Sequence, residues 1–379
     1  MKIEQISLYH ISMPLVESFE TSFGVEEERE CLIVAIHSDG GSGWGEIPVS
    51  RAPGYSYETT GTAWHISQDF IVPALLDADI DSPEDIRGLL KSIKGHPIAK
   101  AGYQAAVWDL LAKMNNLSLQ EMFGGSGESV KVGVSVGLQE SPEALVERVG
   151  RYLEAGYSRI KLKIAPGRDT DEVNAVCAAY PDLMLQVDAN SAYRLDSAES
   201  IRALDEFGLL LIEQPLAEDD IADHARLQPD LKTDLCLDES IHSPDHARWA
   251  LDIDACRVIN IKPARVGGFS EAIQIHDHCL ELEVPVWCGG MLETGIGRAG
   301  NLALASLSNF KLPGDISATE RYYQEDIVDK NFVLNSDSSI DVPQEPGIGV
   351  EVLEEKILDI SIRRDSFRSE VQHNIGFGL

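Results

Sequence analysis

Residues 209–214 read Leu-Leu-Leu-Ile-Glu-Gln, and similar short β-rich runs recur about every 25 residues in this part of the chain. The runs are KVGVSVG at 131–137, RIKLKI at 159–164, LMLQVDA at 183–189, LLLIEQ at 209–214, DLCLDE at 234–239, RVINIK at 257–262 and VPVWC at 284–288. We expect an eighth near residues 310–313. Between the runs lie helix-like segments, several of which open with capping residues, as in Ser141-Pro-Glu-Ala, Asp196-Ser-Ala-Glu and Ser243-Pro-Asp-His. This alternation predicts a parallel sheet, and seven or eight similar units favour a closed (β/α) barrel, a modified TIM barrel.

Residues 1–125 follow a different pattern and predict a separate α+β domain. Strand-like segments lie at 2–10, 30–38 and 43–48, and helical segments lie near 57–76, 83–92 and 98–115. The turn Ser38-Asp-Gly-Gly-Ser-Gly43 indicates a hairpin. We therefore divide the chain into an α+β domain at 1–125, a barrel at 126–330 and a C-terminal segment at 331–379 that we expect to pack on the first domain.

The charge of the chain limits its partners. It has 63 Asp and Glu against 31 Lys and Arg, a net charge of −32. This excess argues against binding to nucleic acid or to an anionic membrane, so we expect a small-molecule substrate. Two questions stay open: whether the acidic surface reflects adaptation to salt, and whether the chain forms a homo-oligomer.

The chain carries no sign of export or of a metal-thiolate site. No basic and apolar leader pattern and no window of about 20 apolar residues is present in the sequence. Cytoplasm is therefore the expected location. The six cysteines are scattered without a C-x-x-C pair, which predicts buried, reduced thiols.

Five successive runs end on ionisable residues. These are Lys163, Asp188, Glu213, Asp238 and Lys262, at intervals of 25, 25, 25 and 24 residues. Barrel active sites form at the C-terminal ends of strands, so we expect these side chains to converge on one cavity. A single charge in such a place is more often an exposed residue at the start of a loop. Five at one interval, each after an apolar run, indicate a shared site, because a buried carboxylate needs a partner.

The three carboxylates of this series predict a metal site. Asp188, Glu213 and Asp238 are hard oxygen donors on adjacent strands, with no Cys and no evident His among them. Such a set favours Mg²⁺, with Mn²⁺ as a substitute. Three protein ligands leave the remaining octahedral positions for water and substrate oxygens, as a Lewis-acid metal requires.

The two lysines flank the carboxylate row, and we predict that they face each other across the metal. In Lys161-Leu-Lys163 the two lysines are two residues apart and share a strand face, so both should point into the barrel. The like charge of Lys161 then favours the neutral form of Lys163, which a general base requires. Lys163 and Lys262 are thus the candidate catalytic residues.

Six motifs, in this order and spacing, resemble the enolase superfamily, and within it the o-succinylbenzoate synthase and N-acylamino acid racemase group. They are Lys161-Leu-Lys163, Val187-Asp-Ala-Asn-Ser191, Ile212-Glu-Gln-Pro215, Leu237-Asp-Glu-Ser240, Asn260-Ile-Lys262 and Trp287-Cys-Gly-Gly-Met-Leu-Glu293. The resemblance covers nearly the whole chain. It implies that the N-terminal domain caps the barrel and that the carboxylates hold Mg²⁺ between the two lysines.

The resemblance also implies an activity. The α-proton of a carboxylate substrate is removed and the resulting enediolate is stabilised by the metal. The leading expectation is an o-succinylbenzoate synthase, a carbon–oxygen lyase that dehydrates 2-succinyl-6-hydroxy-2,4-cyclohexadiene-1-carboxylate in menaquinone biosynthesis, with or without racemisation of N-succinyl and other N-acylamino acids. A dedicated N-acylamino acid racemase and a dipeptide epimerase stay open. Epimerases typically carry Asp-x-Asp after the eighth strand, where this chain has Asp315-Ile-Ser317, which disfavours them.

The same resemblance identifies candidate substrate contacts. Positions that line the pocket in similar proteins are matched by Ser135, Lys161, Asn190, Arg265, Gly290, Met291 and Leu292. Arg265 resembles a feature of members that also racemise N-acylamino acids, although an arginine at a helix start often only forms a surface ion pair. The segment Phe19-Glu-Thr-Ser-Phe-Gly24 resembles the mobile specificity loop, in which Phe19, Ser22 and Phe23 are the candidate contacts.

Other interpretations are less favoured. A lysine of a barrel can form a Schiff base, as in aldolases, but three carboxylates argue against that chemistry. A non-catalytic metal-binding barrel would not need lysines on both sides of the carboxylates. Gly295-Ile-Gly-Arg-Ala-Gly300 matches G-x-G-x-x-G without a Rossmann context, so we expect an anion cradle at a helix start, for a substrate carboxylate, rather than dinucleotide binding. We expect His276 and His278 to be solvated.

Overall fold

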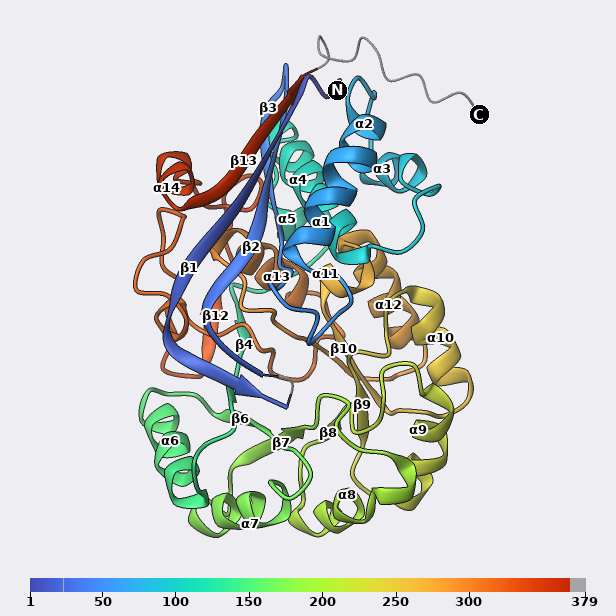
Figure 1. Ribbon diagram of the computed structural model, residues 1–379, viewed down its shortest axis with the longest axis vertical. Helices are drawn as coiled ribbons and strands as arrows, with labels where there is room; N and C mark the ends of the chain where they lie inside the picture. The colour runs from blue at the N-terminus through green and yellow to red at the C-terminus, as the bar shows by residue number, and fades with distance from the viewer. Residues whose placement is uncertain (23, 369–379) are drawn as a thin grey trace.

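The protein, seen here in a computed structural model that describes residues 1–22 and 24–368, has an antiparallel sheet with helices lying over a curled parallel sheet (Figure 1). The antiparallel sheet has the order β13-β1-β2-β3. Its strands are β1 (Gln5–Thr21), β2 (Gly24–Ser38), β3 (Gly41–Ile47) and, from the far end of the chain, β13 (Ser361–Arg368). The turn between β2 and β3 is the predicted hairpin, in which Ser38 pairs with Gly41.

Helices cover one face of this sheet. They are α1 (Thr60–Ile66), which continues through a π-helical turn (Ser67–Ile71) into α2 (Val72–Leu75), then α3 (Pro83–Leu89), α4 (Pro97–Met114) and α5 (Leu119–Phe123). Helix α4 packs closely on β3, where Gly43 and Gly45 approach its backbone so tightly that an added Cβ would lie 2.0 Å from a carbonyl oxygen. A glycine is required at both positions for this close approach.

The second sheet consists of seven parallel strands in the order β11-β10-β9-β8-β7-β6-β5. The strands are β5 (Val134–Val136), β6 (Arg159–Lys163), β7 (Met184–Asp188), β8 (Ile212–Glu213), β9 (Leu235–Leu237), β10 (Val258–Ile261) and β11 (Val286–Cys288). Outside them lie α6 (Pro142–Glu154), α7 (Thr170–Ala179), α8 (Glu199–Ala203), α9 (Ile221–Leu227), α10 (Pro244–Asp252), α11 (Pro263–Val266), α12 (Phe269–Glu281) and α13 (Gly295–Ala305). Each predicted run at 159–288 contains one strand, shorter than the run itself.

The predicted eighth strand is not a regular strand. Residues 310–313 contain one isolated bridge, from Phe310 to Val286 of β11. The following residues nevertheless contact both ends of the sheet, because the amide of Asp315 donates to Cys288 and the carbonyl of Gly314 accepts from Gly133. The ring of strands therefore closes through two isolated bridges, Phe310 to Val286 and Gly314 to Val132, rather than through a paired strand.

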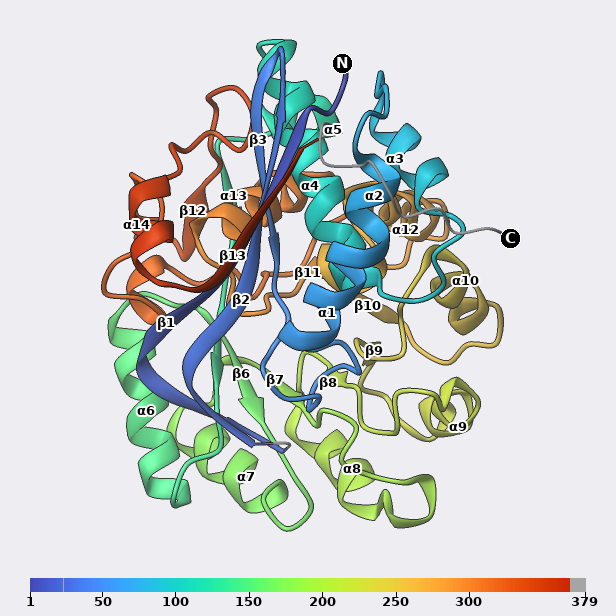
Figure 2. The same ribbon diagram turned by 45° about the horizontal axis from the view of Figure 1, so that its top comes forward.

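The C-terminal part returns to both sheets. Strand β12 (Ser339–Asp341) pairs with β4 (Ser129–Lys131), and β13, which follows α14 (Glu354–Asp359), pairs with β1. The long β1–β2 hairpin leaves the antiparallel sheet and extends towards the ends of β6 and β7 (Figures 1 and 2). The boundaries of the three units proposed from the sequence stay a prediction.

Two local expectations are confirmed and two are wrong. The Ser141 and Ser243 hydroxyls cap α6 and α10 as expected, by accepting from Ala144 and His246. Asp196 does not cap a helix, because it lies inside a 3₁₀ turn (Leu195–Ser197) that precedes α8. His276 is buried rather than solvated, since its Nε2 contacts the amide of Asn309 and its ring stacks on Phe310.

No helix among the described residues is long and apolar enough to cross a membrane. All six cysteines are free, and five of them are buried; Cys177 is half-buried. This agrees with the predicted reduced thiols.

Candidate active site at the ends of the parallel strands

Three carboxylates meet where the parallel strands end. Asp188 ends β7, Glu213 ends β8 and Asp238 directly follows β9. One oxygen of each lies within 4.8 Å of the others, and all three side chains are completely buried. Three buried carboxylates this close repel one another unless cations compensate them. The sequence interval of one βα unit has therefore produced the predicted convergence.

Lysines contact the two outer carboxylates. Lys163, the last residue of β6, donates to Asp188 at 2.7 Å and to the Asn190 side-chain oxygen at 2.7 Å. Lys262, directly after β10, donates to Asp238 at 2.8 Å. Burial by itself would lower the pKa of Lys262, but Asp238 raises it above its usual value, so this ammonium is charged.

Lys161 lies below Lys163 on the same face of β6, as predicted. Its ammonium is 2.5 Å from Asp315, 3.0 Å from Glu213 and 3.2 Å from Asp188. Burial alone would lower the pKa of Lys161, but these carboxylates, Asp315 foremost, raise it well above the usual value. The charge of Lys161 is thus compensated by three carboxylates. The expected effect of this charge on Lys163 stays a prediction.

Asp315 anchors Lys161. It also accepts a hydrogen bond of 2.9 Å from the Ser135 hydroxyl and pairs with Arg159 at 2.6 Å. Burial would raise the pKa of Asp315, but Arg159 and Lys161 lower it below its usual range. The carboxylate in Asp315-Ile-Ser317 is thus fully engaged, and the Ser317 hydroxyl donates to the Gly133 carbonyl.

Arg265 does not line the pocket, which corrects its prediction as a substrate-binding residue. Its buried guanidinium hydrogen-bonds Asp238 and donates to the Ile241 and Asn260 carbonyls at 2.6 and 2.5 Å. The alternative of a surface ion pair is also wrong, because the side chain is buried. Burial would raise the pKa of Asp238, whereas Lys262 and Arg265 hold it below its usual range. Arg265 therefore acts on the site through Asp238.

Asn190 links Lys163 to a second buried carboxyl group. Its backbone has φ of +42°, a left-handed conformation that asparagine tolerates better than most residues. In this conformation the side-chain Nδ2 of Asn190 donates to Glu239 at 2.9 Å, while its Oδ1 accepts from Lys163. Burial, and then the neighbouring Asp238, raise the pKa of Glu239 to about 8.

A residue of the N-terminal domain completes the site. Tyr55, in the loop between β3 and α1, donates to Asp238 at 2.9 Å and accepts from Lys262 at 3.1 Å. The Lys262 ammonium also lies 4.3 Å from the centre of the Tyr55 ring. Burial raises the pKa of Tyr55 above its usual value, so the phenol stays a hydrogen-bond donor. No motif or periodicity indicated this residue.

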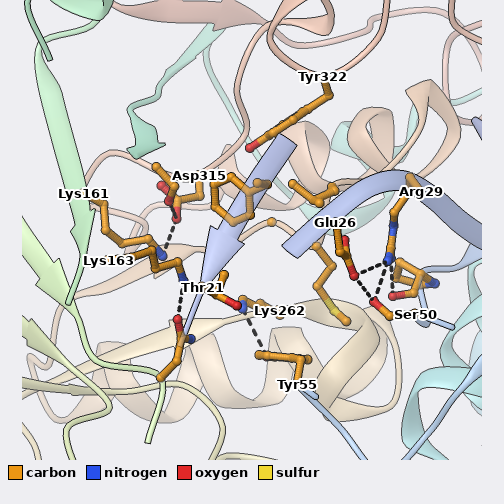
Figure 3. A pocket seen from close by; sticks show the side chains of 17 residues that line it. Thr21, Glu26, Arg29, Ser50, Tyr55, Lys161, Lys163, Lys262, Asp315 and Tyr322 are labelled. Carbon is orange, nitrogen blue, oxygen red and sulfur yellow. Dashed lines mark hydrogen bonds and ion pairs between the residues drawn. The ribbon is translucent and has the colours of Figure 1, made fainter. Parts of the chain in front are cut away.

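Both candidate catalytic lysines, Lys161, Asn190, Asp315 and Tyr55 line one pocket between the two parts of the chain (Figure 3). The three carboxylates of the row contact this lining through the lysines but are not part of it. The empty space of the pocket, including the part open to solvent, is about 700 Å³. Of the predicted residues, its lining includes Phe19, Ser135, Lys161, Lys163, Asn190, Lys262, Gly290, Met291 and Leu292. The N-terminal part contributes five more polar residues: Thr21, which lies in the predicted specificity segment, and Glu26, Arg29, Ser50 and Tyr55, which the sequence did not indicate.

The predicted specificity loop is the end of the β1–β2 hairpin. Phe19 and Thr21 belong to β1 and line the pocket, and Thr21 pairs with Gly24. The Ser22 hydroxyl donates to the Asn190 carbonyl at 3.4 Å, so this end contacts the barrel, although Ser22 is not part of the lining. Phe23 lies outside the described residues.

The glycine motif at 295–300 begins α13, but the anions at this helix start belong to the protein. Glu46 of β3 accepts from the amides of Thr294 and Gly297, and Asp326 accepts from the amide of Gly295. A helix start attracts negative charge, as expected. The expectation that the charge would be a substrate carboxylate is wrong, because these two side chains occupy the amides.

Some of the missed residues could have been found by strand periodicity. Arg159 lies two residues before Lys161, and Asn260, which donates to Glu213 at 2.7 Å, lies two before Lys262. Residues two apart share a face of a strand, so this rule would have placed both on the inner face. The pocket residues of the N-terminal part carry no such signal.

Comparison with known proteins agrees with this geometry. Residues 144–356 match the family described as enolase C-terminal domain-like, and residues 5–124 match the mandelate racemase / muconate lactonizing enzyme N-terminal domain. The chain is 48% identical to a Geobacillus stearothermophilus protein named o-succinylbenzoate synthase, over 93% of this chain and 94% of that one. It is 45% identical to an Amycolatopsis protein named N-succinylamino acid racemase, over 95% and 98% of the two chains.

A solved structure shows the same fold. The crystal structure of an enolase superfamily member from Listeria innocua superposes with a TM-score of 0.93 at 42% identity, covering 97% of this chain and 99% of that one. Both parts of the chain, the antiparallel domain and the ring of parallel strands, are thus accounted for by one architecture. The chain belongs to the enolase superfamily.

Proposed function

We propose that this chain is a magnesium-dependent o-succinylbenzoate synthase that dehydrates 2-succinyl-6-hydroxy-2,4-cyclohexadiene-1-carboxylate, and that the same site racemises N-succinylamino acids. The observation that carries the proposal is the buried row of Asp188, Glu213 and Asp238 with Lys163 at one end and Lys262 at the other. The names of the relatives supply the substrate class.

The donor set fits a hard divalent cation. Asp188, Glu213 and Asp238 offer three carboxylate oxygens within 4.8 Å of one another, which matches the oxygen ligands that Mg²⁺ prefers. Among the described residues, these three carboxylates are the one group of three or more carboxylate, imidazole or thiol ligands whose atoms lie close enough together to hold a metal ion. When bound, the cation supplies Lewis-acid stabilisation of negative charge on the substrate carboxylate.

The protein's own groups move the proton. In the dehydration, Lys163 acts first as the neutral amine, which takes the proton α to the carboxylate, and then as the resulting ammonium, which gives that proton to the departing hydroxyl group so that water leaves. The charged Lys262 stabilises the negative charge that the substrate develops. Asn190 and Asp188 hold the Lys163 ammonium from two sides, which fixes its direction.

A dedicated N-acylamino acid racemase is the second candidate. It is supported by the placement of Lys262, which is separated from Lys163 by the three carboxylate-bearing strands β7, β8 and β9. A racemase needs a proton-carrying group on each face of the α-carbon. A dipeptide epimerase is less favoured, because the residue two after Asp315 is Ser317, whose hydroxyl is bonded to a backbone carbonyl. A Schiff-base aldolase is disfavoured by the ion pairs of both lysines.

The proposal is tested with purified protein and Mg²⁺. We expect conversion of the cyclohexadiene substrate to o-succinylbenzoate, and exchange of the α-proton of an N-succinylamino acid in deuterated water. Lys163→Ala should abolish the dehydration, while Lys311→Ala, which removes an exposed lysine, should not. Absence of both reactions in the wild-type protein would reject the proposed function. Exchange without dehydration would instead favour the dedicated racemase.

A further inference from the structure

The pocket has a second polar end, formed by the N-terminal part of the chain. Figure 3 shows Lys161 and Lys163 on one side of the pocket and Arg29, Glu26 and Ser50 on the other. Arg29 and Glu26 belong to β2, and Ser50 belongs to the loop that also carries Tyr55. None of these three residues takes part in the proton transfer proposed above.

Arg29 carries a buried charge that is only partly compensated. Its side chain is 2% exposed, and it donates to the Ser50 hydroxyl at 2.8 Å and to the Pro48 carbonyl at 2.5 Å. The nearest carboxylate oxygen, on Glu26, is 3.9 Å away, and among the described residues no other forms an ion pair with Arg29. The Nε atom has no hydrogen-bond partner there. A buried guanidinium with spare donors is suited to binding a carboxylate.

The proposed substrates carry a second carboxylate that suits the end of the pocket formed by Arg29. Both o-succinylbenzoate precursors and N-succinylamino acids carry one carboxylate beside the reacting carbon and another at the far end of the succinyl chain. The first belongs with the lysines and the carboxylate row. We propose that Arg29 binds the second carboxylate, so that the enzyme selects succinyl substrates by their distal charge; this inference rests on the proposed function.

Glu26 opposes this binding. Its carboxylate accepts from the Ser50 hydroxyl at 2.8 Å, and its side chain is 29% exposed. A ligand carboxylate beside Arg29 competes with Glu26 for the same guanidinium and is repelled by its negative charge. Glu26 therefore lowers the affinity for a dianionic substrate, and its replacement by glutamine should raise that affinity.

A purely structural role for Arg29 predicts something different. The Arg29 guanidinium joins β2 to the 48–50 segment, and both contribute to the pocket lining. If Arg29 only held these segments together, its loss would impair all substrates alike. Two substrates that differ at the distal group alone separate the roles. N-succinyl and N-butanoyl derivatives of one amino acid are of matched length and differ by a carboxylate in place of a methyl group.

The experiment measures kcat/KM for α-proton exchange of both derivatives with Mg²⁺ present. We expect Arg29→Met to lower the succinyl-to-butanoyl ratio about 10- to 100-fold, mainly through KM, because a charge-assisted bond is lost. Arg29→Lys should restore part of the ratio, and Glu26→Gln should raise it a few-fold. Arg51→Met is the matched control. Arg51 directly follows Ser50 in the loop after β3, and its side chain is 85% exposed, so the succinyl-to-butanoyl ratio should not change.

The outcomes separate the two proposals. If wild-type protein exchanges both derivatives but the ratio is the same in Arg29→Met and Glu26→Gln, Arg29 is not the distal carboxylate site. If Arg29→Met does not fold, the Arg29→Lys and Glu26→Gln ratios decide, and two unchanged ratios overturn the inference. Failure of the wild-type protein to exchange either derivative or to dehydrate its substrate contradicts the proposed function instead.

Discussion

The ammonium of Lys262 lies 2.8 Å from one oxygen of Asp238, the carboxylate that follows the strand beside its own. At the other end of the row, Lys163 lies 2.7 Å from Asp188 in the same relationship. Glu213, on the strand between, forms its ion pair with Lys161, and among the described residues it forms none with Lys163 or Lys262. Two lysines at opposite ends of one carboxylate row suit proton transfer on two faces of one carbon.

The lysines should therefore serve opposite enantiomers. In deuterated water, Lys163→Ala should stop α-proton exchange from one enantiomer of an N-succinylamino acid, while Lys262→Ala shows the reverse preference. Loss of the charge on Lys262 should also slow exchange from both. Proton magnetic resonance of each pure enantiomer measures these rates. Dehydration should fall at least about 10²-fold in both variants, because a positioned acid–base group contributes about 10² to 10⁴. Wild-type dehydration by Lys163→Ala would contradict the mechanism.

Removal of divalent cations should abolish both reactions. The buried carboxylates should bind Mg²⁺ or Mn²⁺, and activity should return when either ion is added back to protein treated with EDTA. Glu213→Gln should weaken Mg²⁺ binding in calorimetric titration and reduce the rise in Tm that Mg²⁺ produces. Glu281→Gln changes an exposed residue of α12 and should behave as wild type. Full activity in thoroughly metal-free protein would reject the site.

Arg265→Ala should lower racemisation more than dehydration. Arg265 binds one oxygen of Asp238 while Lys262 contacts the other, so its loss should disturb Lys262 first. Dehydration uses Lys163 as acid and base and makes fewer demands on the position of Lys262. The ratio of the two kcat/KM values should fall about 10-fold, the effect of about 1.4 kcal/mol at the transition state. Arg265→Lys should recover part of it. Equal losses in both reactions would exclude this positioning role.

Glu46 should make the protein less stable as pH rises. Burial, and then the nearby Glu293, raise the pKa of Glu46 from 4.5 to about 7. Between these values the folded protein keeps a proton that the unfolded chain has lost. The free energy of unfolding therefore falls with pH, by up to about 1.4 kcal/mol per unit from this group.

Glu46→Gln removes this titration and keeps an acceptor for Thr294 and Gly297. Urea unfolding at pH 5.5 and 8 should show the variant gaining stability relative to wild type at the higher pH. Glu281→Gln provides the control for loss of a carboxylate as such. A constant difference between Glu46→Gln and wild type at the two pH values would show that Glu46 does not titrate in this range.

Several properties of the site were predictable because they are local in the chain. A strand of alternating faces and a repeat of one βα unit suffice to place Lys163, Asp188, Glu213 and Lys262 at the same edge of a parallel sheet. The oxygen donors then indicate the kind of metal. The same alternation of strand faces also places Arg159 on the inner face, although Arg159 was not among the predicted site residues.

Other properties depend on contacts that no local pattern reports. Arg265 was expected at the substrate and His276 in solvent, yet one reaches Asp238 and the other packs on Phe310. Both errors concern side chains whose direction is set by a neighbouring βα unit. The amides at the helix start near Gly295 bind a carboxyl group, but this group belongs to Glu46, 249 positions before Gly295 in the chain.

The sequence by itself determined the parallel sheet, the row of carboxylates and the two lysines, because hydrophobic alternation and a constant repeat are read along the chain. The tertiary structure alone decided which groups compensate these charges and which cover them. Asp315 compensates the charge of Lys161, and Tyr55 covers Lys262. The residues of these two pairs are 154 and 207 positions apart in the chain. Such pairs form because burying a charge without a partner is costly, and folding, not sequence spacing, selects the partner.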